Sequence, residues 1–470
     1  EGGGKGEGTP QMMIDRGYVP RKLILVADTA GEEPGQLFTA EKGHAHIDLM
    51  HREAAILKKY TDAPIGTDMM PTNGMSYEKM TAPLDIVQFN HYNTKENLSD
   101  VVFWFDYLRT LKEKPFWNTE TATVWNGSVV IDQVIKPEGF TRINSWLPVA
   151  LGGACNMYWL WRQHWGGQEL NHGAVLWPDG QYFYAAGEIR QTAEEFARAG
   201  DFLSRTRVSS EVALLFSSAA QTLFDVQPII PGNDYRKNLC DWHRALLRAG
   251  ITPDVIGVNH SLEPYKMLVT PFALTLEDED GGHTLTDRIR TFVENGGTWV
   301  VGPMTDVRDR IGAHYLHSMT GILEEMTGAV LTDAIPSDGT VLKLADGREN
   351  PVAHSRWVEA FTMPENAEVL VRINSGHRAL NGRAVVASIP VGRGHVVICG
   401  TFLSDKMLQD MLTDCANASG VTPYEVNGEG EADGEDGEGD VDGKDGEGDT
   451  DSEDSEDDKN DAADKDVKGI

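Results

Sequence analysis

Two short segments of the chain combine acidic, imidazole and indole side chains: FWNTETATVWNG at 116–127 and RQHWGGQELNHGAVLWPDG at 162–180. In the first segment, Glu120 follows a short apolar run and Trp125 comes five residues later. In the second, Glu169 and His172 lie three residues apart. A carboxylate can attack the anomeric carbon of a sugar, an indole offers a flat face to a sugar ring, and a carboxylate with an imidazole can hydrogen-bond adjacent hydroxyls. These residue types indicate carbohydrate chemistry.

Taken singly, the same side chains are ambiguous. An acidic residue in a loop is usually a solvated surface group, so Glu120, Glu169 and His172 are each weak indicators alone. A metal site on Glu169 and His172 would need a third or fourth ligand, and none is apparent nearby in the sequence. We therefore predict no metal site and no cofactor. Whether these residues form a functional site depends on the strands and helices that position them.

Strands that alternate with helices surround both segments. We predict strands at 64–70, 85–92, 115–120 and 156–161 and helices at 45–60, 101–111, 139–153 and 183–203. This alternation is typical of parallel β/α units. A closed (β/α)8 barrel needs eight strands, whereas this region supplies four, or five if residues 22–27 form a strand.

In β/α barrels, functional residues gather at the carboxyl ends of the strands. Glu120 ends the third predicted strand. The strands on either side also end in polar and aromatic residues: Asn90, His91 and Tyr92 before it, and Trp161, Arg162 and Gln163 after it. Polar and aromatic residues therefore replace the apolar ones at the ends of three successive strands, along the same edge of the predicted sheet.

A second alternating region begins near Val208. It contains predicted strands at 211–217, 254–258, 266–271 and 298–303 and helices at 234–250 and 284–297. A β-rich portion with VEAFTM, AEVLVRI, AVVASI and HVVICGTF follows, and a helix near 405–417 completes the region. This order predicts an open, doubly wound sheet.

The net charge of −32 is unevenly distributed. Residues 428–470 hold 20 acidic and 4 basic residues, so one short tail carries −16, half of the total. Such a tail should remain unfolded, and its fragment DVDGKDGEGD departs from a calcium loop because Lys444 takes the place of the third ligand. The overall charge argues against nucleic acid and anionic membranes as partners.

Cysteine spacing and hydropathy indicate the redox state of the thiols and the compartment of the protein. The four cysteines are widely spaced and include no CxxC pair, so we expect reduced thiols: Cys155, Cys240, Cys399 and Cys415. The chain has neither an 18-residue apolar run nor an apolar segment after a basic N-terminus. We therefore expect a cytoplasmic protein with no membrane partner.

The chain resembles glycoside hydrolase family 42, the β-galactosidases. The resemblance rests on PFWNTE, on the W-R-Q…G-G-x-E-x-x-H-G pattern of WRQHWGGQELNHGAV, and on WVEAF and VGRGHVVICGT in the second region. It covers roughly 41–420. It implies the C-terminal part of a (β/α)8 TIM barrel at 41–205 and a flavodoxin/amidotransferase-like doubly wound trimerisation domain at 206–420. Composition adds an irregular leader at 1–40 and a disordered acidic tail at 421–470.

The resemblance also implies residue roles. The carboxylate that ends barrel strand 7 is the nucleophile of these retaining enzymes, and it falls on Glu120. The carboxylate and histidine that contact galactose fall on Glu169 and His172. Tyr92 and Trp125 match positions lining the same pocket. The implied partners are a galactoside substrate and two further copies of the chain in a homotrimer, and an arabinopyranoside stays open as a related substrate.

The chain also departs from the family. If its four strands are barrel strands 5 to 8, the acid/base glutamate, expected in an Asn-Glu pair ending strand 4, would precede residue 41, and residues 1–40 contain no such pair. We therefore expect a truncated glycosidase lacking its acid/base. One alternative is a catalytically inactive remnant or oligomerisation module. Another is an amidotransferase-like enzyme, which needs a cysteine on a tight strand-to-helix turn, whereas Cys240 and Cys399 are predicted inside a helix and a strand.

Overall fold

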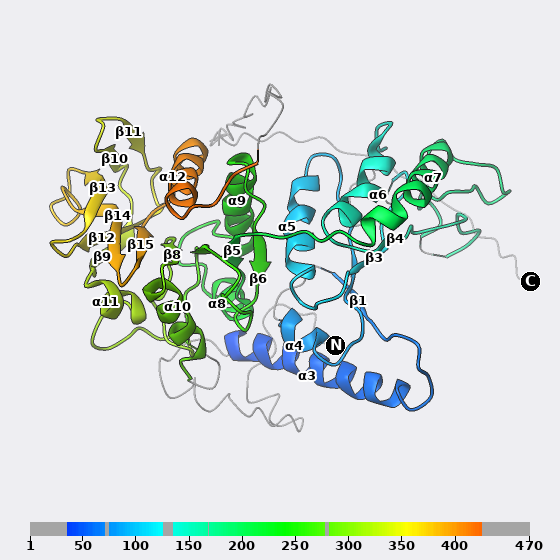
Figure 1. Ribbon diagram of the computed structural model, residues 1–470, viewed down its shortest axis with the longest axis horizontal. Helices are drawn as coiled ribbons and strands as arrows, with labels where there is room; N and C mark the ends of the chain where they lie inside the picture. Colours follow the sequence, from blue (N-terminus) through cyan, green and yellow to red (C-terminus); the bar gives the residue numbers. More distant parts are fainter. Residues whose placement is uncertain (1–34, 71–74, 126–134, 168, 278–281, 425–470) are drawn as a thin grey trace, which may run out of the picture. The chain divides into compact units, whose positions relative to one another are not determined.

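The computed structural model of the protein describes residues 35–70, 75–125, 135–167, 169–277 and 282–424 (Figure 1). The strand considered at 22–27 and the acidic tail from 425 lie outside these residues. Within them, the chain forms one parallel sheet from its first half and one larger mixed sheet from its second half. This is the α/β class predicted from the alternation of strands and helices.

The parallel sheet of the first half is built from short strands that pair in chain order: β1 (Asp68–Met69), β2 (Gln88–Asn90), β3 (Trp117–Glu120) and β4 (Cys155–Asn156). The strand predicted at 156–161 is wrong beyond Asn156. Only the bridge between Ala122 and Trp159 continues the ladder there. The backbone instead turns toward the following loop, because the carbonyls of Leu160 and Trp161 accept hydrogen bonds from Val175 and Leu176.

Helices surround this sheet: α3 (Gly35–Leu57), α4 (Tyr77–Thr81), α5 (Leu98–Leu108), α6 (Phe140–Ala150) and α7 (Ala186–Leu203). The irregular leader predicted for 1–40 is wrong for residues 35–40, which belong to α3. The stretch QLFTAEK contains no proline and several good helix formers, so the helix begins earlier than the apolar periodicity alone indicated.

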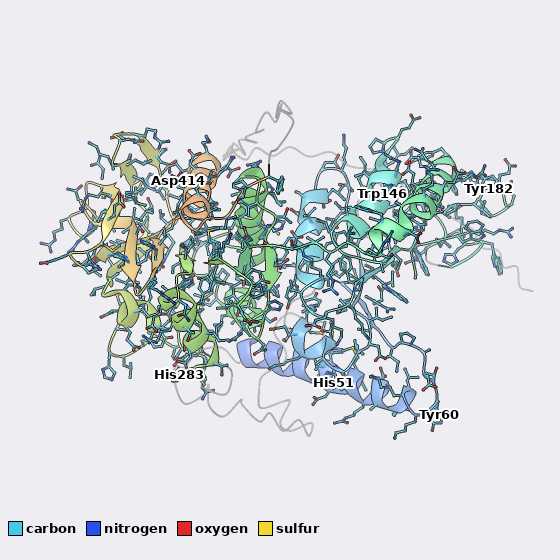
Figure 2. All side chains as sticks on the ribbon, viewed as in Figure 1. His51, Tyr60, Trp146, Tyr182, His283 and Asp414 are labelled. Carbon is cyan, nitrogen blue, oxygen red and sulfur yellow. The ribbon has the colours of Figure 1, made fainter. Side chains whose placement is uncertain are left out.

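Helices α6 and α7 pack against each other through one indole. Trp146 lies in α6 (Figure 2). Its Nε1 donates to Oε2 of Glu195 at 2.7 Å, and its ring lies edge-on to Phe196 with centroids 4.7 Å apart. Arg142 also donates to Glu195 at 3.0 Å. Together these contacts hold the helix that follows β3 against the helix that follows the loop after β4.

The second sheet has an open, doubly wound parallel part. Its strands are β5 (Val212–Leu215), β6 (Asp254–Ile256), β7 (Met267–Thr270), β8 (Thr298–Val301) and β15 (Gly394–Cys399), in the order β15-β8-β7-β5-β6. All residues of β5, β7 and β8 are buried, as expected when helices cover both faces of a parallel sheet. The covering helices are α8 (Ser218–Val226), α9 (Tyr235–Arg248), α10 (Thr284–Glu294) and α12 (Asp405–Ala418).

An antiparallel extension continues from β15. It comprises β14 (Ala384–Val391), β13 (Glu368–Asn374), β10 (Val341–Leu344) and β11 (Glu349–Pro351), with α11 (Ile322–Thr327), β9 (Val330–Pro336) and β12 (Trp357–Thr362) beside it. Helix α12 returns to lie along α9 (Figure 1), where Gln409 donates to the carbonyl of Arg248 at 3.0 Å. The β-rich portion predicted after 357 is therefore confirmed, while β9 to β11 escaped prediction.

Helix α5 joins the two sheets because it is apolar on more than one face. Phe105 stacks on Phe116 beside β3, with centroids 5.3 Å apart. Phe103 contacts Phe216, just after β5, at 6.2 Å. Both α5 rings are fully buried. A helix that is apolar in several directions is buried on several sides, and α5 thereby shares the cores of both halves.

A buried ionic network fixes α5 in this position. Asp106 in α5 has no exposed surface; it is paired with Arg109 and accepts from Nε2 of His243 in α9 at 2.7 Å. Arg109 also donates from Nε to Asp254 at the start of β6 at 2.8 Å, and from Nη2 to the carbonyl of Pro253 at 2.8 Å. Each charged group has a partner, so the network links the first half of the chain to the second.

Replacing Arg109 with leucine should destabilise the protein by about 3–5 kcal/mol, because it leaves buried carboxylates without their counter-ion. The matched control is Arg248→Leu, whose pair with Asp405 is solvent-exposed and should contribute at most about 1 kcal/mol. Urea unfolding followed by circular dichroism measures both. Equal midpoints for the two variants would contradict the role assigned to the network.

Candidate active site

The ends of β2 and β3 bring Tyr92 and Glu120 together. The two strands run parallel, Asn90 lies opposite Glu120, and the His91 amide donates to the Glu120 carbonyl at 3.1 Å. Two residues beyond β2, the Tyr92 hydroxyl donates to Oε1 of Glu120. The polar ends of β2 and β3 therefore form one connected arrangement, as the barrel interpretation predicted. The third predicted strand end, residues 161–163, lies beyond β4, where Gln163 donates to the His172 carbonyl at 3.1 Å.

The environment of Glu120 acts on its pKa in opposing directions. Partial burial raises the pKa of this carboxyl above its usual value, and the nearby Asp68 and Glu169 raise it further. The hydrogen bond from Tyr92 lowers it, because a donor stabilises the ionised form. The result is a basic carboxylate with one oxygen held by a phenol.

His172 lies buried beside Tyr92. Only 2% of its surface is exposed, and the two rings meet edge to face with centroids 5.8 Å apart. Burial lowers the pKa of His172, which favours the neutral imidazole. Its Nδ1 is 2.8 Å from the Gly173 carbonyl, so we assign the proton to Nδ1 and leave Nε2 as an acceptor.

A close backbone approach ties Trp125 to the loop that carries His172. The Trp125 indole donates to the Asn171 carbonyl at 2.7 Å, and the Gly173 amide donates to the Trp125 carbonyl at 3.3 Å. A Cβ on Gly173 would lie 2.3 Å from a methyl group of Val124, so only glycine fits there. Trp125 also packs against Phe183, with centroids 5.2 Å apart.

Glu169 is the exposed member of the group. Its Oε2 accepts from the Trp159 indole at 3.0 Å, and its carbonyl accepts from the His172 amide at 3.0 Å. The carboxylate is near enough to contribute to raising the pKa values of both Glu120 and Tyr92. All five residues chosen from the sequence thus belong to one locality at the carboxyl end of the sheet.

The sequence reasoning missed Asp68, the first residue of the short strand β1. Its Oδ2 accepts from Nδ2 of Asn90 at 2.7 Å, and its Oδ1 accepts from Oγ1 of Thr119 at 2.6 Å. The signal available was a carboxylate near the end of the strand predicted at 64–70.

Lys136 also escaped notice, because nothing in the sequence around it marks a site. Its side chain is 6% exposed, and Nζ donates to the Ala122 carbonyl at 3.2 Å. Burial lowers the pKa of Lys136 to about 8. Its charge contributes to lowering the pKa values of His91 and His172, after the larger effect of burial, and so reinforces the neutral state of both rings.

Doubly wound sheets bind ligands in the crevice where the strand order reverses, which in this sheet lies at the carboxyl ends of β5 and β7. Here a cavity of about 380 Å³ lies between the first turns of α8 and α10. Glu78 of α4 reaches into it, and its Oε1 accepts from the Asn259 amide at 3.1 Å. A Cβ on Gly257 would lie 2.1 Å from the Glu78 carboxyl carbon, so glycine makes room for this side chain. A carboxylate of the same chain therefore occupies part of the crevice.

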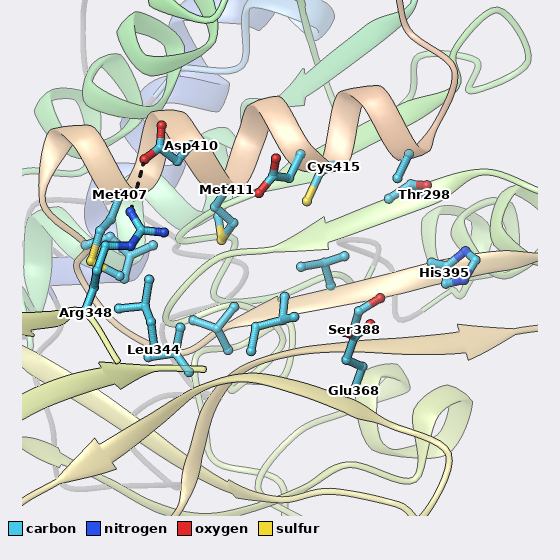
Figure 3. Close-up of a pocket in the computed structure, with 17 residues that line it drawn as sticks. Thr298, Leu344, Arg348, Glu368, Ser388, His395, Met407, Asp410, Met411 and Cys415 are labelled. Atoms are coloured by element: carbon cyan, nitrogen blue, oxygen red, sulfur yellow. Dashed lines mark ion pairs between the residues drawn. The ribbon is translucent and has the colours of Figure 1, made fainter. Parts of the chain in front are cut away.

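A further cavity of about 420 Å³ lies between α12 and the mixed sheet (Figure 3). Methionine and aliphatic side chains form much of its wall, and Arg348 pairs with Asp410 at its edge at 3.7 Å. Burial raises the pKa of the Cys415 thiol to about 12, so this thiol stays protonated and unreactive at neutral pH. This cavity lacks the facing carboxylate and phenol found at β3.

The amidotransferase-like alternative finds no support among the described residues. Cys240 lies within α9 and Cys399 within β15, as predicted, and burial raises the pKa of each thiol to about 12. The left-handed backbone positions of non-glycine residues soon after β8 belong to Met304 and Asp306, at φ 57° and 61°, and neither is a cysteine. In the described ranges, no three His, Cys, Asp or Glu residues are grouped to hold a metal ion, and no helix is both long and apolar enough to cross a membrane.

Comparison with known protein families decides the family. Residues 38–199 match the family described as beta-galactosidase, and residues 210–422 match the beta-galactosidase trimerisation domain. The chain belongs to glycoside hydrolase family 42. The fold class predicted above, a barrel part followed by a trimerisation-type α/β domain, is thereby confirmed.

Relatives extend the family 42 comparison across most of the chain. The β-galactosidase YesZ of Bacillus licheniformis is 28% identical over 404 residues, covering 82% of this chain and 57% of that protein. YesZ of Bacillus subtilis is 28% identical over 387 residues, covering 80% of this chain and 55% of that protein. The chain thus spans little more than half the length of these relatives.

Solved structures share the family 42 fold. The β-galactosidase of Bacillus circulans sp. alkalophilus superimposes with a TM-score of 0.76 at 20% identity, over 83% of this chain and 58% of that one. The enzyme of Halorubrum lacusprofundi gives 0.76 at 22% identity, over 85% of this chain and 62% of that one. At 20–22% sequence identity, the similarity between this chain and the two solved structures shows a shared fold and nothing more.

Within this candidate site, Tyr92→Phe should raise the pKa of Glu120. The lost phenol stabilised the ionised carboxylate, so without it ionisation requires a higher pH. Carbon-13 NMR titration of labelled glutamate carboxyls, with Glu120→Gln identifying the resonance, measures the change. Tyr182→Phe is the control, because Tyr182 is 63% exposed in the loop before α7 (Figure 2). An unchanged titration in Tyr92→Phe would disprove the coupling.

Proposed function

We propose that the protein is a β-galactosidase-type retaining glycoside hydrolase with Glu120 as its nucleophile, acting on terminal β-D-galactosyl residues. The observation that carries the proposal is the Glu120 carboxylate at the end of a parallel strand, with one oxygen held by the Tyr92 hydroxyl. Family membership supports a galactoside as the substrate, and the position of Glu120 at the strand end beside Tyr92 supports its role as the nucleophile.

In the proposed reaction, the free oxygen of Glu120 attacks the anomeric carbon, and the bond to the leaving oxygen breaks as the galactosyl ester forms. The Tyr92 hydrogen bond to Oε1 orients the carboxylate and leaves Oε2 for attack. A second carboxyl must protonate the leaving oxygen and later activate water. The sequence contains no Asn-Glu pair of the kind that supplies this acid/base in the family.

The remaining site residues are proposed to bind the sugar. Glu169 and the Nε2 of His172 would hydrogen-bond galactose hydroxyls, and Trp125 would present its ring to the apolar face of the sugar. Trp159 holds Glu169 at 3.0 Å, and the Gly173 carbonyl orients the His172 ring. Each proposed sugar contact therefore has its own supporting contact.

Glu120→Gln should reduce cleavage of an activated aryl galactoside by about 10³-fold or more, because the amide cannot form the galactosyl ester. An activated aryl leaving group departs without a proton, so this substrate tests the nucleophile independently of the acid/base. Release of the phenolate is followed by absorbance, with Glu113→Gln, an exposed glutamate before β3, as the control. Equal rates for the native chain and Glu120→Gln would refute the assignment.

A second candidate function is that of a catalytically inactive oligomerisation module. The match of residues 210–422 to a trimerisation domain favours it. The four-stranded sheet of the described residues also has two edge strands, β1 and β4, which a partner could cover.

We expect the purified chain to form a homotrimer, with a molar mass three times that of the single chain in light scattering coupled to size exclusion. A monomer at micromolar concentration would contradict this expectation. A trimer that neither hydrolyses the activated galactoside nor accumulates a galactosyl ester would favour the inactive module over the glycosidase.

A further inference from the structure

Asp68 in β1 connects the carboxyl-terminal parts of β2 and β3. Its carboxylate accepts from Asn90 at the end of β2 and from Thr119 in β3, at 2.7 and 2.6 Å. Thr119 directly precedes Glu120, and Asn90 stands opposite Glu120 in the parallel register. A single carboxylate thus holds both neighbours of the proposed nucleophile.

The charge on Asp68 has no counter-ion in the described part of the chain. The residue is exposed, and within the described ranges no lysine, arginine or histidine forms an ion pair with it. Its hydrogen bonds come only from neutral donors, an amide and a hydroxyl. The negative charge therefore remains at the rim, beside the carboxylate of Glu120.

We propose that Asp68 is a positioning residue for Glu120, which holds the end of β3 through Thr119 and uses its unpaired charge to tune the reactivity of the neighbouring carboxylate. This inference rests on the proposed function, since it treats Glu120 as the nucleophile. It adds a third carboxylate to a site in which Glu120 would attack and Glu169 would bind the sugar.

The groups that face Glu120 divide into two sets. After partial burial, the negative charges of Asp68 and Glu169 raise the pKa of Glu120 by repulsion. Tyr92, from the segment after β2, lowers it. A higher pKa makes the ionised carboxylate more nucleophilic but restricts it to higher pH. Asp68 and Tyr92 therefore shift the pKa of Glu120 in opposite directions.

Two substitutions separate the charge from the hydrogen bonds. In Asp68→Asn, the amide oxygen can still accept from Asn90, and the amide nitrogen can donate to Thr119, whose hydroxyl also reaches the Phe89 carbonyl at 3.3 Å. Asparagine thus removes mainly the charge. Asp68→Ala removes both the charge and the ties between the strands. Asp62→Asn is the matched control, because Asp62 lies at the amino-terminal side of the strands, in a cavity with Asp85.

The experiment uses the full chain and two readouts. The first is the pKa of Glu120 from carbon-13 NMR titration, which needs no catalysis. The second is the pH profile of covalent labelling of Glu120 by a 2-deoxy-2-fluorogalactoside with an activated leaving group, followed by mass spectrometry. Circular dichroism confirms that each variant is folded.

We expect Asp68→Asn to lower the pKa of Glu120 and to accelerate labelling on the acid limb, by about tenfold if the pKa falls by about one. Labelling at high pH should slow, because the carboxylate becomes less basic. Asp68→Ala should show the same pKa change with a further loss of labelling rate at every pH, while Asp62→Asn matches the native chain.

An unchanged pKa of Glu120 in Asp68→Asn would overturn the inference, and so would labelling profiles that differ only in Asp68→Ala. A third outcome is a lowered pKa of Glu120 in Asp68→Asn together with no labelling of Glu120 in the native chain. The proposed nucleophile would then be wrong, whereas the coupling between Asp68 and Glu120 would stand.

Discussion

The carboxylate of Asp106 has no contact with water, and its charge can be tolerated only where Arg109 and His243 meet it. Removing a charged group from water costs far more than one hydrogen bond returns, so all three residues must be in place together. Because Arg109 also binds Asp254 at the start of β6, this requirement fixes α5 against the second sheet.

Helix α5 in turn determines the position of the candidate site. Strands β1 and β4 span two residues each in the described chain, too few to be stable by themselves. The sheet is held from one side by the rings of α5, where Phe105 contacts both Phe89 of β2 and Phe116 beside β3. Tyr92 and Glu120 extend from these two strands, so their meeting depends on aromatic packing beneath them.

Two glutamates show how surroundings determine the use of one functional group. Glu78 enters a crevice where a backbone amide binds it and Gly257 leaves space for it, so its carboxylate serves to join parts of the fold. Glu120 is bound by one phenol, stays partly exposed and lies beside Asp68. The carboxylate of Glu78 is therefore bound within the fold, whereas one oxygen of Glu120 stays available for chemistry.

The sequence by itself determined the alternation of strands and helices, the position of Glu120 at a strand end, and the pairing of Glu169 with His172 in one loop. These features follow from hydrophobic period and short spacing, which are local. The start of α3, the early end of β4 and the role of Glu78 were not predictable in this way, since backbone partners and distant segments decide them. Asp68 shows the reason most directly: its partners lie 22 and 51 residues away, and only the register of the parallel strands brings them to it.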